Sequence, residues 1–161
     1  MQDRLTVMLK SGGNHEAALG QALRAVLEHF HSETGTIHQL DRERQMLYLV
    51  AQVGLPPQML EIVKTIPVGK GIAGQAIAQG RAVTICNLQT DASGVAKPGA
   101  KQTGVGGALC VPLRDGDEII GTIGIGTIRP YEYAPEETRA LEKAGRSIGA
   151  YLSRIQPAPS S

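Results

Sequence analysis

Two cysteines, Cys86 and Cys110, are the side chains in the 161-residue sequence best suited to nucleophilic or redox chemistry. They do not form a C-x-x-C pair, and two cysteines are too few for a disulfide framework. A free cysteine most often packs as a small buried apolar residue. The alternative is a thiol sensor formed by both side chains facing one cavity, and the sequence leaves their separation open.

The histidines offer no metal site. His29 and His31 stand two residues apart on a predicted helix, so their side chains point roughly 200° apart and cannot bind one metal ion together. We interpret both as surface residues of that helix. His38 alternates with Ile37 in a predicted strand, and we therefore expect it on the more polar face of the sheet, without a partner.

Positive charge gathers in one section of the chain. Between Gly69 and Arg114 the only acidic residue is Asp91, and the net charge of this section is +4, against +1 for the whole chain. Such a section favours an anionic ligand, for example a carboxylate or a phosphate. The alternative is that these charges are simply solvated. The basic residues are Lys70, Arg81, Lys97, Lys101 and Arg114.

The composition excludes several functional classes. A net charge of +1 lacks the strongly basic surface of a general nucleic-acid binder. No apolar run approaches the roughly 18 residues of a membrane span, and the charged residues among the first ten do not fit a signal peptide. We therefore expect a cytoplasmic protein that binds neither nucleic acid nor membrane. With 42% apolar residues, the chain is long enough for one domain with a sizeable core.

Hydrophobic periodicity divides the chain into helices and strands. Leu19, Leu23 and Val26 repeat at helical spacing, whereas runs rich in Ile, Leu and Val between polar turns predict strands. The predicted elements are a helix over 14–31, strands over 36–40 and 46–53, a short helix near 59–63, a glycine-rich turn over 66–74, a helix over 72–79 that ends at Gly80, a strand over 82–86, a long loop over 87–106, strands over 109–113 and 119–128, and a helix over 135–155.

Strands joined by hairpins favour an antiparallel sheet, so the sequence predicts an α+β fold with the first and last helices on one face. Alternation places large residues such as Leu109 and Ile123 on one face of the last hairpin. The other face carries small residues, which either let helices approach closely or leave room for a ligand. They are Ala108, Cys110, Pro112, Gly124 and Gly126. We predict a single domain over 14–155, an N-terminal extension over 1–13 and a flexible tail over 156–161.

Four segments carry a resemblance to a known family: Ile66-Pro-Val-Gly-Lys-Gly-Ile-Ala-Gly-Gln-Ala, Gly80-Arg-Ala-Val, Leu109-Cys-Val-Pro-Leu and Ile120-Gly-Thr-Ile-Gly. With the order of the elements, they resemble a GAF domain over roughly residues 14–154. The resemblance implies a central antiparallel sheet of five or six strands, with the terminal helices on one face and a lid and short helices on the other. It also implies a sensory module that binds a small molecule, often as a dimer, and regulates an attached or partner domain.

The better-known subclasses of this family do not fit. The cyclic-nucleotide motif needs Lys or Arg after its Asn, whereas Leu88 follows Asn87. Bilin-binding members need a cysteine beside a histidine, and neither cysteine here has one. Reductases of free methionine-R-sulfoxide resemble this chain in fold, but they carry a cysteine where Ala73 stands and another in the lid, which here has none between 87 and 106. We therefore expect no catalytic residue, with such a reductase as the alternative.

The resulting interpretation is a non-catalytic sensory or regulatory module that closes a lid over a small, anionic ligand. The sequence identifies neither the ligand nor a cofactor. A further alternative is a dimerisation module with a vestigial pocket. The predicted ligand-binding residues are Asn87, Lys97, Lys101, Thr103, Cys110 and Arg114.

The terminal helices also predict the assembly. Tyr151 and Leu152 are adjacent, so both cannot lie at the centre of one narrow apolar stripe, and one of them is left for a second subunit. The apolar segment 5–9 is too short to be stable alone and is expected to dock on the same surface. We predict a homodimer that signals through these helices to an effector domain or partner protein. The alternative is that these residues pack within one subunit.

Overall fold

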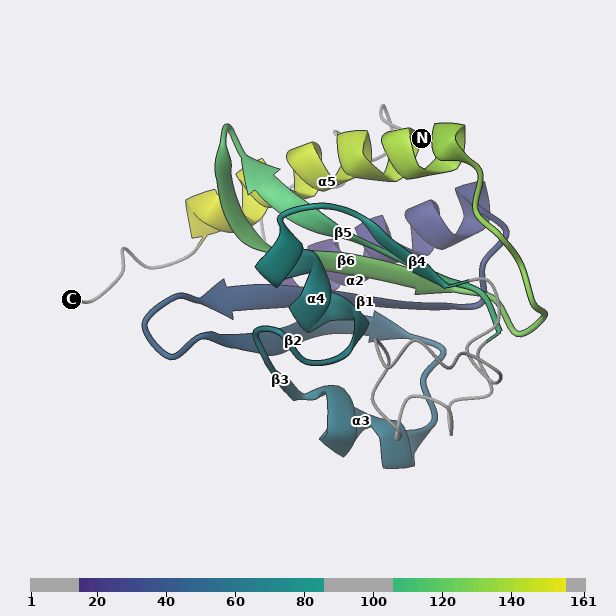
Figure 1. Cartoon of the computed structure of the whole chain (residues 1–161), viewed down its shortest axis with the longest axis horizontal. Coiled ribbons are helices and arrows are strands. Elements are labelled where there is room, and N and C mark those ends of the chain that lie inside the picture. Colours follow the sequence, from purple (N-terminus) through teal and green to yellow (C-terminus); the bar gives the residue numbers. More distant parts are fainter. Residues whose placement is uncertain (1–14, 86–105, 156–161) are drawn as a thin grey trace.

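The computed structural model describes residues 15–85 and 106–155 (Figure 1). Every predicted helix and strand that falls in these ranges is present, with ends shifted by a few residues. One short strand, Thr65–Pro67, is additional, because the sequence reads there as a turn. The elements are α2 (His15–His29), β1 (Thr34–Asp41), β2 (Met46–Val53), α3 (Pro57–Val63), β3 (Thr65–Pro67), α4 (Gly71–Gln79), β4 (Val83–Ile85), β5 (Ala108–Asp115), β6 (Glu118–Gly126) and α5 (Pro135–Ile155).

The strands form one six-stranded antiparallel sheet in the order β3-β2-β1-β6-β5-β4. Helices α2 and α5 cover one face of the sheet, and α3 and α4 lie on the other side (Figure 1). The predicted α+β architecture is confirmed. Pro112 lies inside β5, beyond the stretch of β5 that pairs with β4, so its missing N–H leaves the β4 ladder intact.

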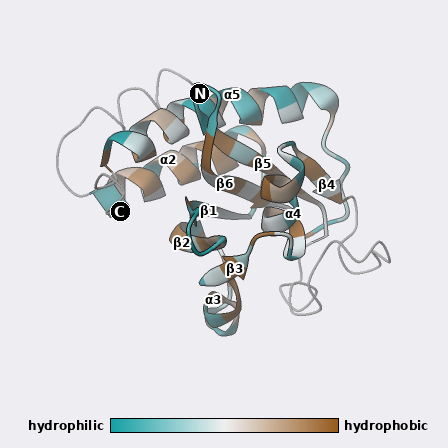
Figure 2. Cartoon of the chain, turned by 60° about the vertical axis from the view of Figure 1, so that its left-hand side comes forward, coloured by the Kyte–Doolittle hydropathy of each residue, from teal (hydrophilic) through white to brown (hydrophobic). Residues whose placement is uncertain are grey.

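The larger core lies between the sheet and the terminal helices. Its strand residues include Leu109, Val111 and Ile123, which are fully buried, as the predicted alternation requires. The helices turn their apolar sides to this core and their hydrophilic sides outward (Figure 2). Contact between α5 and β5 is close, because a Cβ atom built on Gly149 would lie 2.4 Å from the carbonyl oxygen of Arg114.

A smaller core lies on the opposite face, under α4. It contains Leu47, Ile66, Ala76, Val83 and Cys110. Helix α4 ends at Gly80, which has a left-handed φ of 65° and donates its N–H to the carbonyl of Ile77, as expected of a glycine C-cap. Because both faces of the sheet are covered, neither is a solvated polar face.

Two expectations about the helices are wrong. His31 is exposed, as predicted, but it lies beyond the end of α2 with a φ of 51°, rather than on the helix. Tyr151 and Leu152 are both buried within the chain, at 5% and 1% exposure, so neither is left over for a second subunit. The buried side of α5 is wider than a narrow stripe because it touches both the sheet and α2, where the Tyr151 hydroxyl lies 2.8 Å from Nδ1 of His15.

Candidate functional site

The candidate site is built on the face of the sheet opposite the terminal helices. Strand β6 lies between β1 and β5, and pairing across the three strands forms rows of neighbouring side chains. In two of these rows the residue on β6 is a glycine, so no side chain rises from the middle strand. The rows are Thr34–Gly126–Ala108, Thr36–Gly124–Cys110 and His38–Thr122–Pro112.

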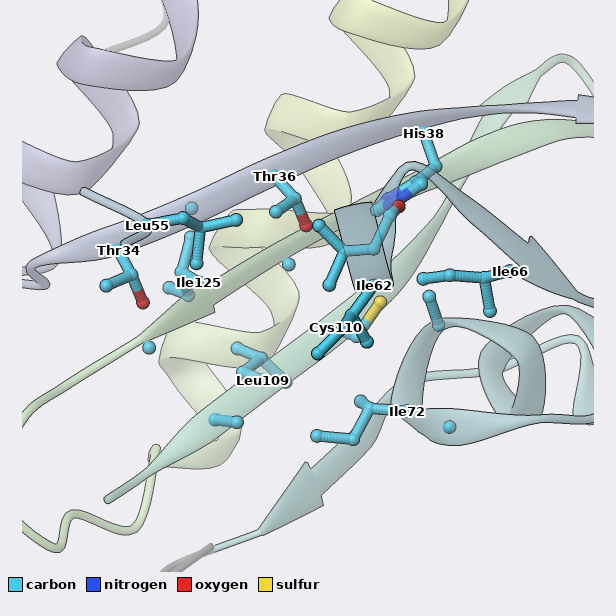
Figure 3. Close-up of a pocket in the computed structure, with 17 residues that line it drawn as sticks. Thr34, Thr36, His38, Leu55, Ile62, Ile66, Ile72, Leu109, Cys110 and Ile125 are labelled. Atoms are coloured by element: carbon cyan, nitrogen blue, oxygen red, sulfur yellow. The ribbon is translucent and has the colours of Figure 1, made fainter. Parts of the chain in front are cut away.

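The glycines leave a cavity of about 150 Å³ between the sheet and the elements that cover it. Its walls are largely apolar, and Figure 3 shows Ile62 and Ile72 near Cys110. The covering residues come from the loop after β2, from α3, β3 and the first turn of α4. They are Leu55, Ile62, Val63, Ile66, Gly71, Ile72 and Ala73. The face that the sequence marks as lined by small residues is therefore the face that holds the cavity.

His38 lines this cavity, and the expectation that it lies on a polar face without a partner is wrong. It is 1% exposed, and its Nε2 lies 2.8 Å from the carbonyl oxygen of Val63. A carbonyl oxygen can only accept, so Nε2 carries the hydrogen and donates it. The bond ties β1 to the end of α3. The alternation with Ile37 is correct, but the second face of the sheet is covered rather than solvated.

Two threonines on β1, Thr34 and Thr36, also turn their hydroxyl groups into the cavity (Figure 3). Thr34 is 9% exposed, and its hydroxyl forms no hydrogen bond within the described part of the chain. Sequence reasoning missed this pair. The available signal was the spacing of Thr34, Thr36 and His38 at alternate positions, which puts three polar side chains on the face opposite Ile37.

Of the two predicted ligand-binding residues that lie in the described ranges, Cys110 lines the cavity and Arg114 does not. Cys110 is 3% exposed, and burial raises the pKa of its thiol from 9.0 to about 12, against a smaller lowering effect of the neighbouring Thr122 hydroxyl. The thiol therefore stays protonated at neutral pH. A protonated, buried thiol is a weak nucleophile and behaves as a small apolar group with a polar edge.

Arg114 lies away from the cavity, near the end of β5. Its Nη2 donates a 2.7 Å hydrogen bond to the carbonyl oxygen of Gly80, at the C-terminus of α4. A cation at this end of a helix is favourable. The other predicted ligand-binding residues, Asn87, Lys97, Lys101 and Thr103, lie outside the described residues, as does Cys86.

No Lys, Arg, Asp or Glu lines the cavity within the ranges that the structure describes. Lys70 and Arg81, the other basic residues of the +4 section in those ranges, are exposed. Over residues 15–85 and 106–155 there is also no group of three or more metal-binding side chains. None of the helices in these ranges is both long and apolar enough to cross a membrane.

Comparison with known proteins identifies the family. The GAF domain family model matches residues 14–153, so the chain belongs to the GAF domain family, as the sequence resemblance predicted. No curated protein sequence matches it significantly.

Solved structures share this fold at low sequence identity. The GAF domain of an Acinetobacter phosphoenolpyruvate-protein phosphotransferase has a TM-score of 0.79 at 16% identity, covering 94% of this chain and 90% of that one. The corresponding domain from Coxiella burnetii has a TM-score of 0.79 at 17% identity, with the same coverage. A free methionine-R-sulfoxide reductase from Neisseria meningitidis, in complex with its substrate, has a TM-score of 0.76 at 16% identity, covering 94% and 85%.

Proposed function

We propose that this GAF domain is a sensory or regulatory module of the cytoplasm that binds a small molecule in the cavity and catalyses no reaction itself. The observation that carries the proposal is the floor of the cavity, where the central strand β6 has the glycines Gly124 and Gly126 and therefore no side chains. Glycine weakens a strand interior, so two glycines at the bottom of a cavity suit a site that a ligand fills. Polar groups at the edge supply orientation, as in small-molecule sites generally.

The same strands support a route from the ligand to the terminal helices. Cys110 faces the cavity, and its neighbour Val111 faces the core under α5. Because Gly149 brings the backbone of α5 against the carbonyl of Arg114, we expect a shift of β5 to displace the helix. A ligand that favours one position of β5 thereby favours one position of α5, which is the surface that an effector domain or partner would detect.

The state of the described cysteine supports a role without catalysis. Methionine sulfoxide reduction by cysteine needs a thiolate, whereas burial raises the pKa of Cys110 to about 12. Ala73, at the position where the resemblance places a cysteine in the reductases, contributes a methyl group to the cavity wall. The test is an assay of free methionine-R-sulfoxide reduction, with Cys86 and Cys110 replaced in turn. Turnover that depends on either cysteine would overturn the non-catalytic proposal.

Ligand binding is tested by a thermal-shift screen of small metabolites against the whole chain, repeated with Gly124→Ala. A compound present at about 100 times its Kd should stabilise the protein by about 2.7 kcal/mol. We expect at least one compound to raise the Tm of the wild-type chain but not that of Gly124→Ala. A broad screen that finds no such compound would contradict the proposal and favour the alternative of a dimerisation module with a vestigial pocket.

A further inference from the structure

The shape of the cavity floor limits what can lie on it. Gly124 and Gly126 form a trough along β6, bordered on one side by Thr34 and Thr36 and on the other by Ala108 and Cys110. Neighbouring strands are about 4.8 Å apart, so the side chains of β1 and of β5 that border the trough each stand about that distance from the backbone of β6. A flat group can rest on the exposed glycine peptides, with the side chains of α3 and α4 above it.

The chemistry of the described lining favours a neutral ligand. Its polar groups are hydroxyls, a thiol that stays protonated, and an imidazole N–H already bonded to the Val63 carbonyl. An anion that enters such a cavity loses its water and meets no cationic side chain of the described lining, which costs several kcal/mol. An apolar molecule gains free energy from the same desolvation.

One edge of the trough provides hydrogen bonding. Thr34 is nine-tenths buried, its hydroxyl turns into the cavity, and it has no partner within the described residues. The hydroxyl of Thr36 borders the trough directly, because it lies 3.3 Å from the position that a Cβ atom on Gly124 would occupy. A ligand with a hydroxyl or carbonyl group at this edge can form a hydrogen bond with either threonine, because a hydroxyl can donate and accept.

The volume sets the size. An engineered apolar cavity of about 150 Å³ in another protein binds benzene, and the cavity here is also about 150 Å³. We infer, on the basis of the proposed function, that the ligand is a small neutral molecule with a flat apolar body and one hydroxyl or carbonyl group, lying over Gly124 and Gly126 with that group at Thr34 and Thr36.

Three ring probes that differ in one substituent test the inference on the full chain. They are 4-fluorobenzyl alcohol, which is neutral and can hydrogen-bond; 4-fluorotoluene, which is neutral and cannot; and 4-fluorobenzoate, which is an anion at neutral pH. Titration followed by fluorine NMR gives the Kd of each. We expect the alcohol to bind at least about tenfold more tightly than the benzoate. The reason is that burying an unpaired carboxylate costs more free energy than one neutral hydrogen bond contributes.

Four variants locate the bound ring. Thr34→Val and Thr36→Val keep the shape of the side chain and remove its hydroxyl. Combined in one protein, they should raise the Kd of the alcohol about threefold to tenfold and leave the Kd of 4-fluorotoluene unchanged. Thr84→Val, on the exposed side of β4, is the matched control and should change neither probe. Gly124→Ala places a methyl group in the trough and should weaken both neutral probes. Its nearest contact would be 3.3 Å, so the fold should survive, as circular dichroism would check.

The outcomes separate this inference from the proposed function. Tighter binding of the benzoate would overturn the inference and favour the anionic ligand predicted from the +4 section, while a binding function would stand. If the threonine variants weaken the binding of the alcohol and of 4-fluorotoluene equally, the threonine hydroxyls do not bond to the ligand, and this result would also overturn the inference. If none of the three probes binds, the inference is wrong. The proposed function would then fail only if the metabolite screen also finds no compound that depends on Gly124.

Discussion

The ionisation of Cys110 links one side chain to the stability of the whole domain. Its pKa is 9.0 when unburied and about 12 in the fold, so the folded state holds the thiol proton more tightly than the unfolded state does. A group with a raised pKa contributes its full stabilisation below the unfolded value and loses it as the pH rises toward the folded value. The sensitive range therefore lies between about pH 9 and pH 12.

We predict that the free energy of unfolding falls by about 1.4 kcal/mol per pH unit above about pH 9 through Cys110 alone. Urea unfolding at about pH 8 and about pH 10.5 measures the loss, and Cys110→Ala should be less sensitive by about 2 kcal/mol over this interval. Tyr133, whose pKa burial also raises to about 12, contributes equally to both proteins and cancels in the comparison. Identical pH dependence of the two proteins would contradict the assignment.

His38 holds the cavity wall together, because its buried side chain joins β1 to the end of α3. Replacing it by alanine leaves the Val63 carbonyl without its 2.8 Å donor and opens a void beside α3. We expect His38→Ala to destabilise the protein by about 2 to 4 kcal/mol in urea unfolding. His29→Ala, at an exposed position at the end of α2, should change stability by less than about 0.5 kcal/mol. Similar losses in the two variants would show that the bond to Val63 contributes little.

At the scale of elements, the contact between α5 and β5 reverses the usual effect of a glycine replacement. In a helix interior, alanine is more stable than glycine by up to about 1 kcal/mol. Gly20 on α2 has nothing within 4 Å of a built Cβ atom, so Gly20→Ala should stabilise the protein by about that amount. Gly149→Ala should instead destabilise it by about 1 to 3 kcal/mol, because its Cβ atom would lie 2.4 Å from the Arg114 carbonyl.

Thermal unfolding of the two variants side by side measures this difference. Opposite shifts of Tm are expected, downward for Gly149→Ala and upward for Gly20→Ala. Two upward shifts would mean that α5 can move away from β5 at little cost. In that case the mechanical coupling proposed between the cavity and α5 would lose its basis.

The elements show which features the sequence can predict. Gly80 and the Asp115-Gly116 turn are local signals, and they mark the end of α4 and the β5–β6 hairpin correctly. The small-residue face of β5 and β6 also follows from simple alternation. Strand β3 was missed, because three residues that include Pro67 carry no periodicity and are recognisable only through their pairing with β2.

The site was harder to predict for a physical reason. The polarity of Thr34 and His38 suggests a solvated face, and only the packing of α3 and α4 over this face of the sheet converts it into a cavity wall. Arg114 belongs to the basic section of the sequence, but its side chain reaches the end of α4 rather than the cavity. Charge counted along the chain therefore does not say which space a side chain faces. Tyr151 and Leu152 make the same point, since their burial depends on α2 and the sheet together.

At the scale of the whole molecule, the homodimer stays a prediction, with a changed physical basis. Large hydrophobic residues that remain exposed in the described parts of the surface are Ile62 and Ile128. The outer side of α5 is hydrophilic (Figure 2). Its first turn carries Glu136 and Glu137, and Arg154 lies in its last turn. In a twofold arrangement with antiparallel α5 helices, the acidic end of one helix would meet the basic end of the other.

We therefore expect a dimer through α5 to depend on salt. Light scattering at tens of micromolar should give twice 17.0 kDa at low ionic strength and move toward the monomer mass in about 0.5 M salt, where charges are screened beyond a few ångströms. Arg154→Glu, at an exposed position in the last turn of α5, would place an acidic side chain opposite Glu136 and Glu137 of the second copy and should weaken the dimer without unfolding the chain. Leu152→Glu is unsuitable, because it would bury a charge in the core. A monomer mass at low salt would exclude the dimer, and a dimer insensitive to both salt and Arg154→Glu would exclude α5 as its interface.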